Sequence, residues 1–463
     1  MAEGAHPAGG GRARRAPPRT TVSEDGLNRS AGRAARPISV PGIATRALRS
    51  GYYSDAYFLN ASRILAAAAR TGERFVGRPP AAHAGIRPVE SFVPGDAEVE
   101  MQFFARRAPS FVAAGIGPAL GILRDGARGG RGGAARLRVR AVREGTLARP
   151  QHPVLVVRGR YRDFAHLETP LLGVLTRCSR VATNVYESLL ASRGKPIMFF
   201  PARFDLPHCQ PLDGYAYRVA LATYAAVTGI RVPAHVSTDA QGALWAERGS
   251  GTMPHAFILC FLGDTAEAVL AFCRHAPPSV LRVALVDTTN DCVGESVRTA
   301  RRLLEEHLRL LRAGRSAEAA RYVLHAVRVD TAQDLRDKSV PASPDPRLER
   351  GVTPVLAKLV RGALDQASQG MGLSGRWRTA ADRYVRGVRI VATGGFDPGK
   401  IRLFEKRRAP VDVYGVGSFL LRGAANDYTA DVVRVRVGGR FVTMAKTGRR
   451  PRRSHELRPV RLC

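Results

Sequence analysis

The second half of the chain alternates short apolar runs with longer segments whose apolar residues recur at helical spacing. From Pro196 onward, the apolar runs predict strands at 197–200, 234–237, 283–286, 323–329, 388–392 and 411–413. The segments between them predict helices that include 215–227, 297–311 and 355–364. Short strands that alternate with amphipathic helices are typical of βα units around a parallel sheet. We therefore expect an irregular α/β barrel over residues 161–420.

The first part of the chain has a less regular pattern. Asn60 is placed to cap a helix over 61–69, and residues 98–123 look helical although glycines interrupt them. Strands are predicted at 137–142 and 154–157. These pieces predict a smaller α/β domain, over residues 46–160, in front of the barrel.

Three further segments complete the domain picture. Residues 1–45 are mainly Ala, Gly, Pro and Arg, and we expect a disordered basic tail. Apolar residues between Tyr161 and Ser192 have helical spacing, with a kink or break expected at Pro170. Residues 421–463 return to strand-like alternation, so we expect them to complete the smaller domain.

Two consecutive predicted strands end in glycine turns. The run 388–392 leads into Gly394 and Gly395, and the run 411–413 leads into Gly415 and Gly417. In α/β barrels the active site lies at the carboxyl ends of the strands, and the turns after the last two strands commonly hold a phosphate. Glycine allows backbone N–H groups to approach a phosphate closely. A pair of such turns in adjacent units favours a phosphate site over an ordinary strand-to-helix connection.

The same stretch contains most of a P-loop, because Gly394–Lys400 has the form G-x-x-x-x-G-K. The motif needs Ser or Thr as its next residue, and Ile401 stands there. Asp397-Pro398 also interrupts the run of N–H groups and is typical of a helix start. A P-loop is therefore disfavoured.

Charge and cysteine content limit the kinds of partner. The chain of 463 residues has 72 Lys and Arg against 39 Asp and Glu, a net charge of +33. This favours anionic ligands and, through the basic tails, non-specific nucleic-acid contact. Six cysteines without a C-x-x-C pair argue against a zinc site and a disulfide framework, and no run is apolar enough to span a bilayer. We expect a cytoplasmic protein without a membrane partner.

Polar residues also follow other predicted strands. Phe200 and Arg203, the segment 251–255, Asp287, and the segment 328–331 all lie where barrel chemistry would occur. Each alone has an ordinary explanation as a core residue, surface ion pair or cap. Their shared position at one end of a sheet indicates a site, in which arginines bind phosphate or carboxylate and aspartates face a ribose or Mg²⁺.

The order of these motifs resembles the nicotinate phosphoribosyltransferases, and most closely their archaeal-type branch, from about Tyr53 to Asp431. The motifs that carry the resemblance are SDAY at 54–57, EGT at 144–146, LETPLLGVL at 167–175, Phe200 with Arg203, GTMPH at 251–255, VDT at 286–288, VRVDT at 327–331, DKS at 337–339, TGGFD at 393–397 and YGVGS at 414–418. The resemblance implies a type II phosphoribosyltransferase barrel with an open-faced sandwich as the smaller domain.

The resemblance also implies roles for individual residues. Tyr57 of a partner subunit and Phe200 would enclose the pyridine ring, so we expect a homodimer with shared active sites. Arg328 would bind the nicotinate carboxylate or the adjoining phosphate, and Arg203 would bind phosphate. Thr238 takes the position at which nicotinamide-specific relatives have an acid, although a shift of one residue would place Asp239 there.

Further roles concern phosphoryl groups. Asp287 and Asp330 would face the ribose and the Mg²⁺ that accompanies phosphoribosyl pyrophosphate, with no metal ligand assigned to the protein itself. His255 matches the histidine that is phosphorylated when ATP hydrolysis is coupled to the reaction. The residues that would bind the 5-phosphate are Gly394, Gly395, Gly415, Gly417 and Ser418.

The implied enzyme is an ATP-linked nicotinate phosphoribosyltransferase of NAD salvage, which converts nicotinate and phosphoribosyl pyrophosphate into nicotinate mononucleotide and pyrophosphate. Quinolinate phosphoribosyltransferase shares the architecture and is the first alternative; it would need more basic residues for its second carboxylate. A nucleic-acid-binding protein on the same scaffold is the second. The sequence departs from the family where Pro201 and Phe204 replace its usual Gly and second Arg, which puts the ring pocket in doubt.

Overall fold

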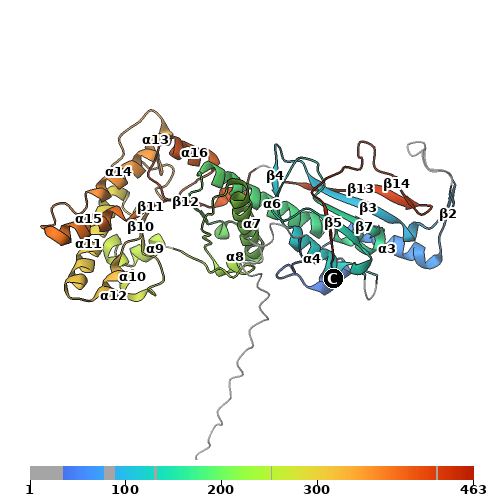
Figure 1. The fold of residues 1–463 in the computed structure, drawn as a ribbon, viewed down its shortest axis with the longest axis horizontal. Coiled ribbons are helices and arrows are strands. Elements are labelled where there is room, and N and C mark those ends of the chain that lie inside the picture. Colours follow the sequence, from blue (N-terminus) through green and yellow to red (C-terminus); the bar gives the residue numbers. More distant parts are fainter. Residues whose placement is uncertain (1–34, 78–88, 130–132, 252, 424–425, 463) are drawn as a thin grey trace, which may run out of the picture.

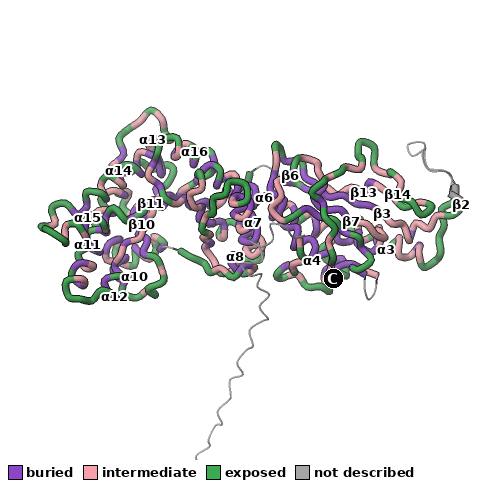
Figure 2. Tube along the Cα trace, in the orientation of Figure 1, coloured by how far each residue is buried: buried purple, intermediate pink, exposed green. Residues whose placement is uncertain are grey.

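The computed structural model describes residues 35–77, 89–129, 133–251, 253–423 and 426–462. Two sheets lie towards opposite ends of the molecule, and the helices α6 (Glu168–Ala191) and α7 (Gln210–Thr228) lie between them (Figure 1). Buried residues run through both sheets and along these two helices (Figure 2). The site discussed below depends on this connection, because α6 contacts both parts.

The first sheet is antiparallel and six-stranded. Its strands in spatial order are β14 (Arg440–Thr443), β13 (Tyr428–Val437), β3 (Glu98–Ala105), β7 (Leu155–Arg160), β5 (Arg138–Ala141) and β15 (Arg458–Val460). β13 lies against β3 with Tyr428 opposite Ala105. Segments from both ends of the described chain therefore share one sheet. The domain boundaries given above stay a prediction.

The helix predicted over 98–123 is wrong for most of its length. These residues form β3, the short strand β4 (Phe111–Ala113) and only then a helix, α4 (Ile116–Gly126). All residues of β3 after Glu98 are buried. Residues 98–103 nevertheless alternate polar and apolar side chains, which is the period of a strand and was overlooked in the helix prediction.

Two helix starts also differ from prediction. α3 (Ala56–Thr71) begins after Asp55, so Asn60 lies inside the helix and does not cap it. The break expected at Pro170 occurs earlier, between α5 (Tyr161–Phe164) and α6. Pro170 lies in the first turn of α6, where a missing N–H removes no helical hydrogen bond.

The second sheet is parallel and carries the predicted βα units. Its spatial order is β8 (Ile197–Phe199), β12 (Val413–Val416), β11 (Arg389–Ala392), β10 (Ala326–Val329) and β9 (Val283–Leu285). Helices α10 (Thr265–His275), α11 (Cys292–Arg312), α14 (Pro354–Asp365), α15 (Gly375–Arg386) and α16 (Pro398–Lys406) connect or flank these strands (Figure 1). The predicted mixed α/β class with a parallel sheet is confirmed.

Within the described residues, the strand pairing of this sheet does not close into a barrel. The strand predicted at 234–237 is reduced to a single parallel bridge between Val236 and Phe199, and the opposite edge ends at β9. The described strand pairings therefore do not join Val236 to β9 into a closed ring.

Ordered structure begins before the predicted limit of the tail. Residues 1–34 lie outside the described part, but Val40 is buried and the Ile38 N–H donates to the Gly117 carbonyl at 2.9 Å. A short helix, α2 (Thr45–Ser50), follows. No helix in the described part of the chain combines the length and apolar character needed to cross a membrane.

Candidate functional site

A cavity of about 380 Å³ lies at the carboxyl ends of β8, β10, β11 and β12. Residues predicted for the site from distant parts of the sequence meet there. Those lining the cavity are Phe200, Arg203, Arg328, Asp330, Gly394, Gly395, Gly415, Gly417 and Ser418. The parallel register explains the meeting, because side chains at equivalent ends of neighbouring strands are adjacent.

Arg328 is the best-fixed charged group of the cavity. Its Nε donates to Thr393 Oγ1 at 3.0 Å, and its Nη2 pairs with Asp330 Oδ2 at 2.5 Å. Its guanidinium carbon lies 5.6 Å from the centre of the Phe200 ring. Stacking on Phe200 and hydrogen bonds to two neighbouring side chains hold the guanidinium plane in one orientation, which suits a carboxylate or phosphate ligand.

The glycine turns allow the backbone to form the cavity wall. A Cβ at Gly415 would lie 2.4 Å from Thr393 Cγ2 and 3.2 Å from the Phe200 ring. Gly394 and Gly395 have φ values of +94° and +64°, a region that favours glycine. Close approach and left-handed geometry therefore both require glycine around the cavity.

The first turn is supported from the helix behind it. Asp397 Oδ1 accepts from the Lys400 N–H at 2.7 Å and caps α16, as expected. Lys400 Nζ donates to the Gly394 carbonyl at 2.8 Å and lies 4.5 Å from the centre of the Phe396 ring. Burial lowers the pKa of Lys400 from 10.5 to about 8. The lysine of the P-loop-like sequence therefore binds the turn itself.

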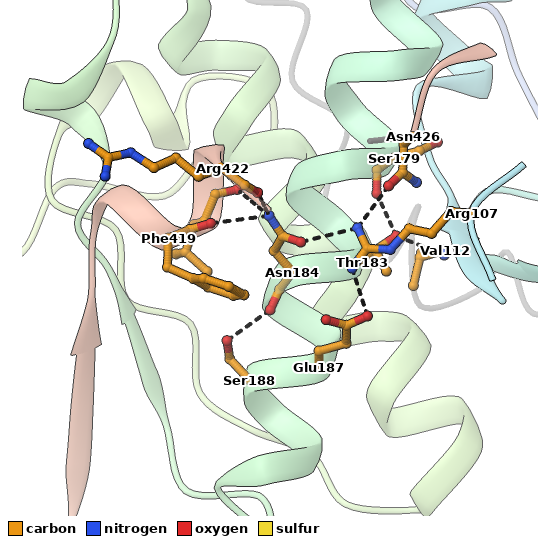
Figure 3. Close-up of polar contacts among 11 residues, drawn as sticks. Arg107, Val112, Ser179, Thr183, Asn184, Glu187, Ser188, Phe419, Arg422 and Asn426 are labelled. Carbon is orange, nitrogen blue, oxygen red and sulfur yellow. Dashed lines mark hydrogen bonds and ion pairs between the residues drawn. The ribbon is translucent and has the colours of Figure 1, made fainter. Parts of the chain in front are cut away.

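The second turn is supported by α6. Ser418–Leu421 forms a short 3₁₀ turn after β12. Asn184 points from α6 towards this segment, with Arg107 on its other side (Figure 3). The two glycine turns thus differ in their support: a lysine of the following helix holds one, and a helix of the central region holds the other.

His255 and Asp287 form a pair beside the cavity and do not line it. His255 begins the short helix α9 (His255–Leu259), and its Nε2 lies 3.0 Å from Asp287 Oδ1. Burial raises the pKa of Asp287, and the nearby His255 opposes that rise. Pro254 connects the pair to the cavity wall. A half-exposed imidazole held by a carboxylate has the arrangement of a general base or nucleophile.

Two predicted residues lie elsewhere. Tyr57, on α3, is 63% exposed and its hydroxyl donates to Asp55 Oδ2 at 3.3 Å. Its role as a partner-subunit residue stays a prediction. Thr238 caps a short helix and donates to Gln210 Oε1 at 2.7 Å, whereas the preceding Ser237 lines the cavity.

Several cavity residues were missed in the sequence. They are Ser237, Ser250, Thr393 and Phe396, whereas Gly251, Met253 and Pro254 belong to the segment 251–255 that was predicted for the site. Thr393 could have been found, because it directly precedes Gly394 at the end of a predicted strand. Within the described residues, no group of three or more His, Cys, Asp or Glu is arranged to hold a metal ion.

A second and larger cavity, of about 920 Å³, borders the amino ends of the same strands. Its walls include the apolar side chains of Met198, Val283, Ala326, Val391 and Val413. Of the predicted site segments, 251–255 reaches it through Gly251, which borders both cavities together with Ser250.

The fold has a counterpart among solved structures. A crystal structure of nicotinate-nucleotide pyrophosphorylase from Pyrococcus furiosus matches 90% of this chain and 82% of its own, with a TM-score of 0.58 and 25% identical residues. The parallel sheet, the accompanying antiparallel sheet and the cavity at the strand ends define the fold of a type II phosphoribosyltransferase.

Sequence comparisons indicate which phosphoribosyltransferases this chain is similar to. Residues 85–179 match the family described as quinolinate phosphoribosyl transferase, N-terminal domain. A nicotinate phosphoribosyltransferase of Mycobacterium tuberculosis is 26% identical over 281 residues, and one of Bos taurus is 27% identical over 296 residues. These matches cover 61% and 60% of this chain but 47% and 51% of the relatives, so the chain spans about half their length. They confirm the resemblance to the nicotinate phosphoribosyltransferase family.

Proposed function

We propose that the chain transfers a phosphoribosyl group from phosphoribosyl pyrophosphate to nicotinate and forms nicotinate mononucleotide and pyrophosphate. The observation that carries this proposal is the pair formed by Arg328 and Phe200, which faces glycine turns in one cavity. An aromatic face with an adjacent guanidinium suits a flat heteroaromatic carboxylate. The turns beside it suit the 5-phosphate.

The reaction breaks one bond and forms one bond at C1 of the ribose. The bond from C1 to the pyrophosphate oxygen breaks, and its electron pair leaves with pyrophosphate. The lone pair of the nicotinate ring nitrogen forms the new bond and leaves a pyridinium. The chain has to position the two reactants in line and stabilise the departing anion. Phe200 and Arg328 would orient the ring, and Arg203 would bind a phosphate oxygen.

Mg²⁺ would arrive with phosphoribosyl pyrophosphate and would supply charge neutralisation of the leaving group. Asp330 lines the cavity, and Asp287 lies next to it with its carboxylate against His255. We propose that these two carboxylates face the ribose hydroxyls and the metal.

ATP coupling is the second part of the proposal. His255 is positioned by Asp287 and is 43% exposed at its side chain, so the ring can meet a nucleotide phosphate. Phosphorylation would transfer the γ-phosphoryl group of ATP to an imidazole nitrogen with release of ADP. In this proposal, hydrolysis of the phosphohistidine supports tight binding of phosphoribosyl pyrophosphate.

Quinolinate is the alternative acceptor, favoured by the family name matched at residues 85–179 and by the name of the Pyrococcus structure. Its second carboxylate needs a further cation. Among the described residues that line the cavity, Arg203 and Arg328 are the side chains of the Arg, Lys or His type. The 5-phosphate also requires positive charge. Two arginines therefore suit an acceptor with one carboxylate better than an acceptor with two.

The test is product analysis with phosphoribosyl pyrophosphate, Mg²⁺ and each of nicotinate, quinolinate and nicotinamide, with and without ATP. We expect nicotinate mononucleotide from nicotinate and more of it with ATP. Release of CO₂ from quinolinate would replace this proposal with the alternative, and preference for nicotinamide would overturn the choice of base.

A further inference from the structure

Asn184 is fully buried on α6 and contacts the segment that follows the second glycine turn. Its Nδ2 donates to the carbonyl oxygens of Phe419 and Leu420, both at 3.2 Å, and to that of Arg422. One side-chain amide therefore faces several carbonyls of the segment 419–422, directly after Gly417 and Ser418 in the cavity wall.

Arg107 fixes the orientation of this amide. Its Nη1 donates to Asn184 Oδ1 at 3.2 Å and to Asn426 Oδ1 at 2.8 Å, and its Nη2 pairs with Glu187 Oε1 at 2.7 Å (Figure 3). A guanidinium can only donate, so the Asn184 oxygen must face Arg107 and its NH₂ must face the carbonyls. Arg107 follows β3 of the antiparallel sheet, so the contact connects that sheet to the cavity.

The path of the chain agrees with this assignment. Gly423 has φ of +96°, and a Cβ there would lie 3.4 Å from Asn184 Oδ1. The segment therefore passes directly over the amide. Asn184 is the buried polar group at this point, and its loss would leave the carbonyls of 419 and 420 without this partner.

We propose that Asn184 is a positioning residue for the phosphate-binding wall at Gly417 and Ser418, and that Arg107 holds it in place. This inference rests on the proposed function. Asn184 does not line the cavity and acts through the 419–422 segment. The role predicts a specific loss of affinity for phosphoribosyl pyrophosphate, whereas a purely structural role predicts loss of stability alone.

The main variant is Asn184→Asp, which keeps the size of the side chain and places a carboxylate oxygen against carbonyl oxygens. We expect its KM for phosphoribosyl pyrophosphate to rise about 10-fold or more, because several hydrogen bonds of ordinary strength are lost. The KM for nicotinate should change less than about twofold. Calorimetric titration with phosphoribosyl pyrophosphate alone should show the same loss in Kd.

Ser188→Ala is the matched control. Ser188 is buried on the same helix, and its Oγ donates to the Asn184 main-chain carbonyl at 2.8 Å. Among the hydrogen bonds of the described residues, Ser188 makes none to 419–422, so the KM of this variant for phosphoribosyl pyrophosphate should match that of the wild type. Glu187→Gln is a milder variant that weakens the Arg107 pair, and we expect its KM to rise about two- to threefold. It keeps the test valid if Asn184→Asp does not fold.

The outcomes separate the two proposals. A wild-type protein that binds phosphoribosyl pyrophosphate but forms no nicotinate mononucleotide contradicts the proposed function, and the titration still tests Asn184. A folded Asn184→Asp protein with lower Tm and unchanged Kd for phosphoribosyl pyrophosphate overturns the positioning role. If only Glu187→Gln folds, an unchanged Kd in that variant overturns it as well.

Discussion

The carboxyl and amino ends of the parallel sheet each border a cavity, and the two cavities differ in what lines them. The strands are the same, and successive inward-facing positions lie two residues apart. On three neighbouring strands, a step of two residues towards the carboxyl end leads from Ala326 to Arg328, from Val391 to Thr393 and from Val413 to Gly415. The comparison teaches that the polar and charged side chains lining a cavity, rather than the volume of the cavity, identify the candidate site.

Arg328→Ala should give the largest loss of activity among the variants that distinguish the two ends of the sheet. Loss of the guanidinium removes charge-assisted hydrogen bonds to the ligand and leaves Asp330 unpaired, so we expect kcat/KM for nicotinate to fall on the order of 100-fold. Arg389→Ala is the control, because Arg389 begins the adjacent strand and lines the larger cavity. Steady-state kinetics of both variants checks this, and equal losses would remove the distinction between the two ends.

Gly415→Ala should have the next largest effect. The new methyl group would lie 2.4 Å from Thr393 Cγ2, so Thr393 and its bond to Arg328 must move. We expect kcat/KM to fall about 10-fold, as overpacking typically costs 1–3 kcal/mol.

The control for this change is Gly362→Ala on α14. A Cβ at Gly362 meets nothing within 4 Å, and alanine favours a helix. Its activity should stay at the wild-type level with a slightly higher Tm. Normal kinetics in Gly415→Ala would show that the turn can accept a side chain.

His255→Ala should abolish the stimulation by ATP and leave the ATP-independent rate within about threefold. The physical reason is that the imidazole lies beside the cavity without lining it. Radiolabelled γ-phosphate should appear on the wild-type protein and be absent from the variant. Full stimulation in the variant would rule out the phosphohistidine.

Lys400 predicts two pH effects of opposite sign. Because burial lowers its pKa to about 8, the folded protein loses this proton above that pH, while the unfolded chain keeps it up to about 10.5. The KM for phosphoribosyl pyrophosphate should therefore rise severalfold above pH 8, as the cation behind the turn is lost. The free energy of unfolding should increase over the same range, since the unfolded chain then binds more protons.

Lys400→Met should flatten both pH profiles. Denaturant titrations and steady-state kinetics between pH 7 and pH 10, compared with the wild type, measure the two effects. A variant with the wild-type pH dependence would assign the effect to another group.

Val413→Ile should have the smallest effect. The added methylene enters the larger apolar cavity, and burying it is worth about 0.8 kcal/mol. We expect kinetic constants within about twofold and an increase of a few degrees in Tm. A strong loss of activity would mean that the larger cavity takes part in the reaction.

The sequence predicted much of the parallel sheet and its cavity, because both depend on local patterns. Strand-then-glycine runs identified Gly394, Gly395, Gly415 and Gly417, and the parallel arrangement brought them together with Arg328. The resemblance added residue roles that local patterns do not contain.

The remaining features depend on contacts between distant segments. β3 was mistaken for helix although residues 98–103 alternate polar and apolar side chains, and the burial of Glu100 depends on its pairing with Arg158 and Arg434 of the neighbouring strands. Ser237, and not Thr238, lines the cavity, since helix capping by Thr238 fixes its side chain elsewhere. The contact between Asn184 and Leu420 joins residues 236 positions apart, and no periodic signal marks such a pair.

The pairing of β3 with β13 has a consequence for biosynthesis. Glu100 and Arg434, on these two strands, are 334 positions apart. At about 5–20 residues per second, a ribosome needs roughly 20–70 s to add the partner strand after β3 has emerged. During that time the edge of β3, whose apolar positions include Met101 and Phe103, has no partner from β13. The nascent chain should therefore depend on chaperones or on early association of β7 to avoid aggregation.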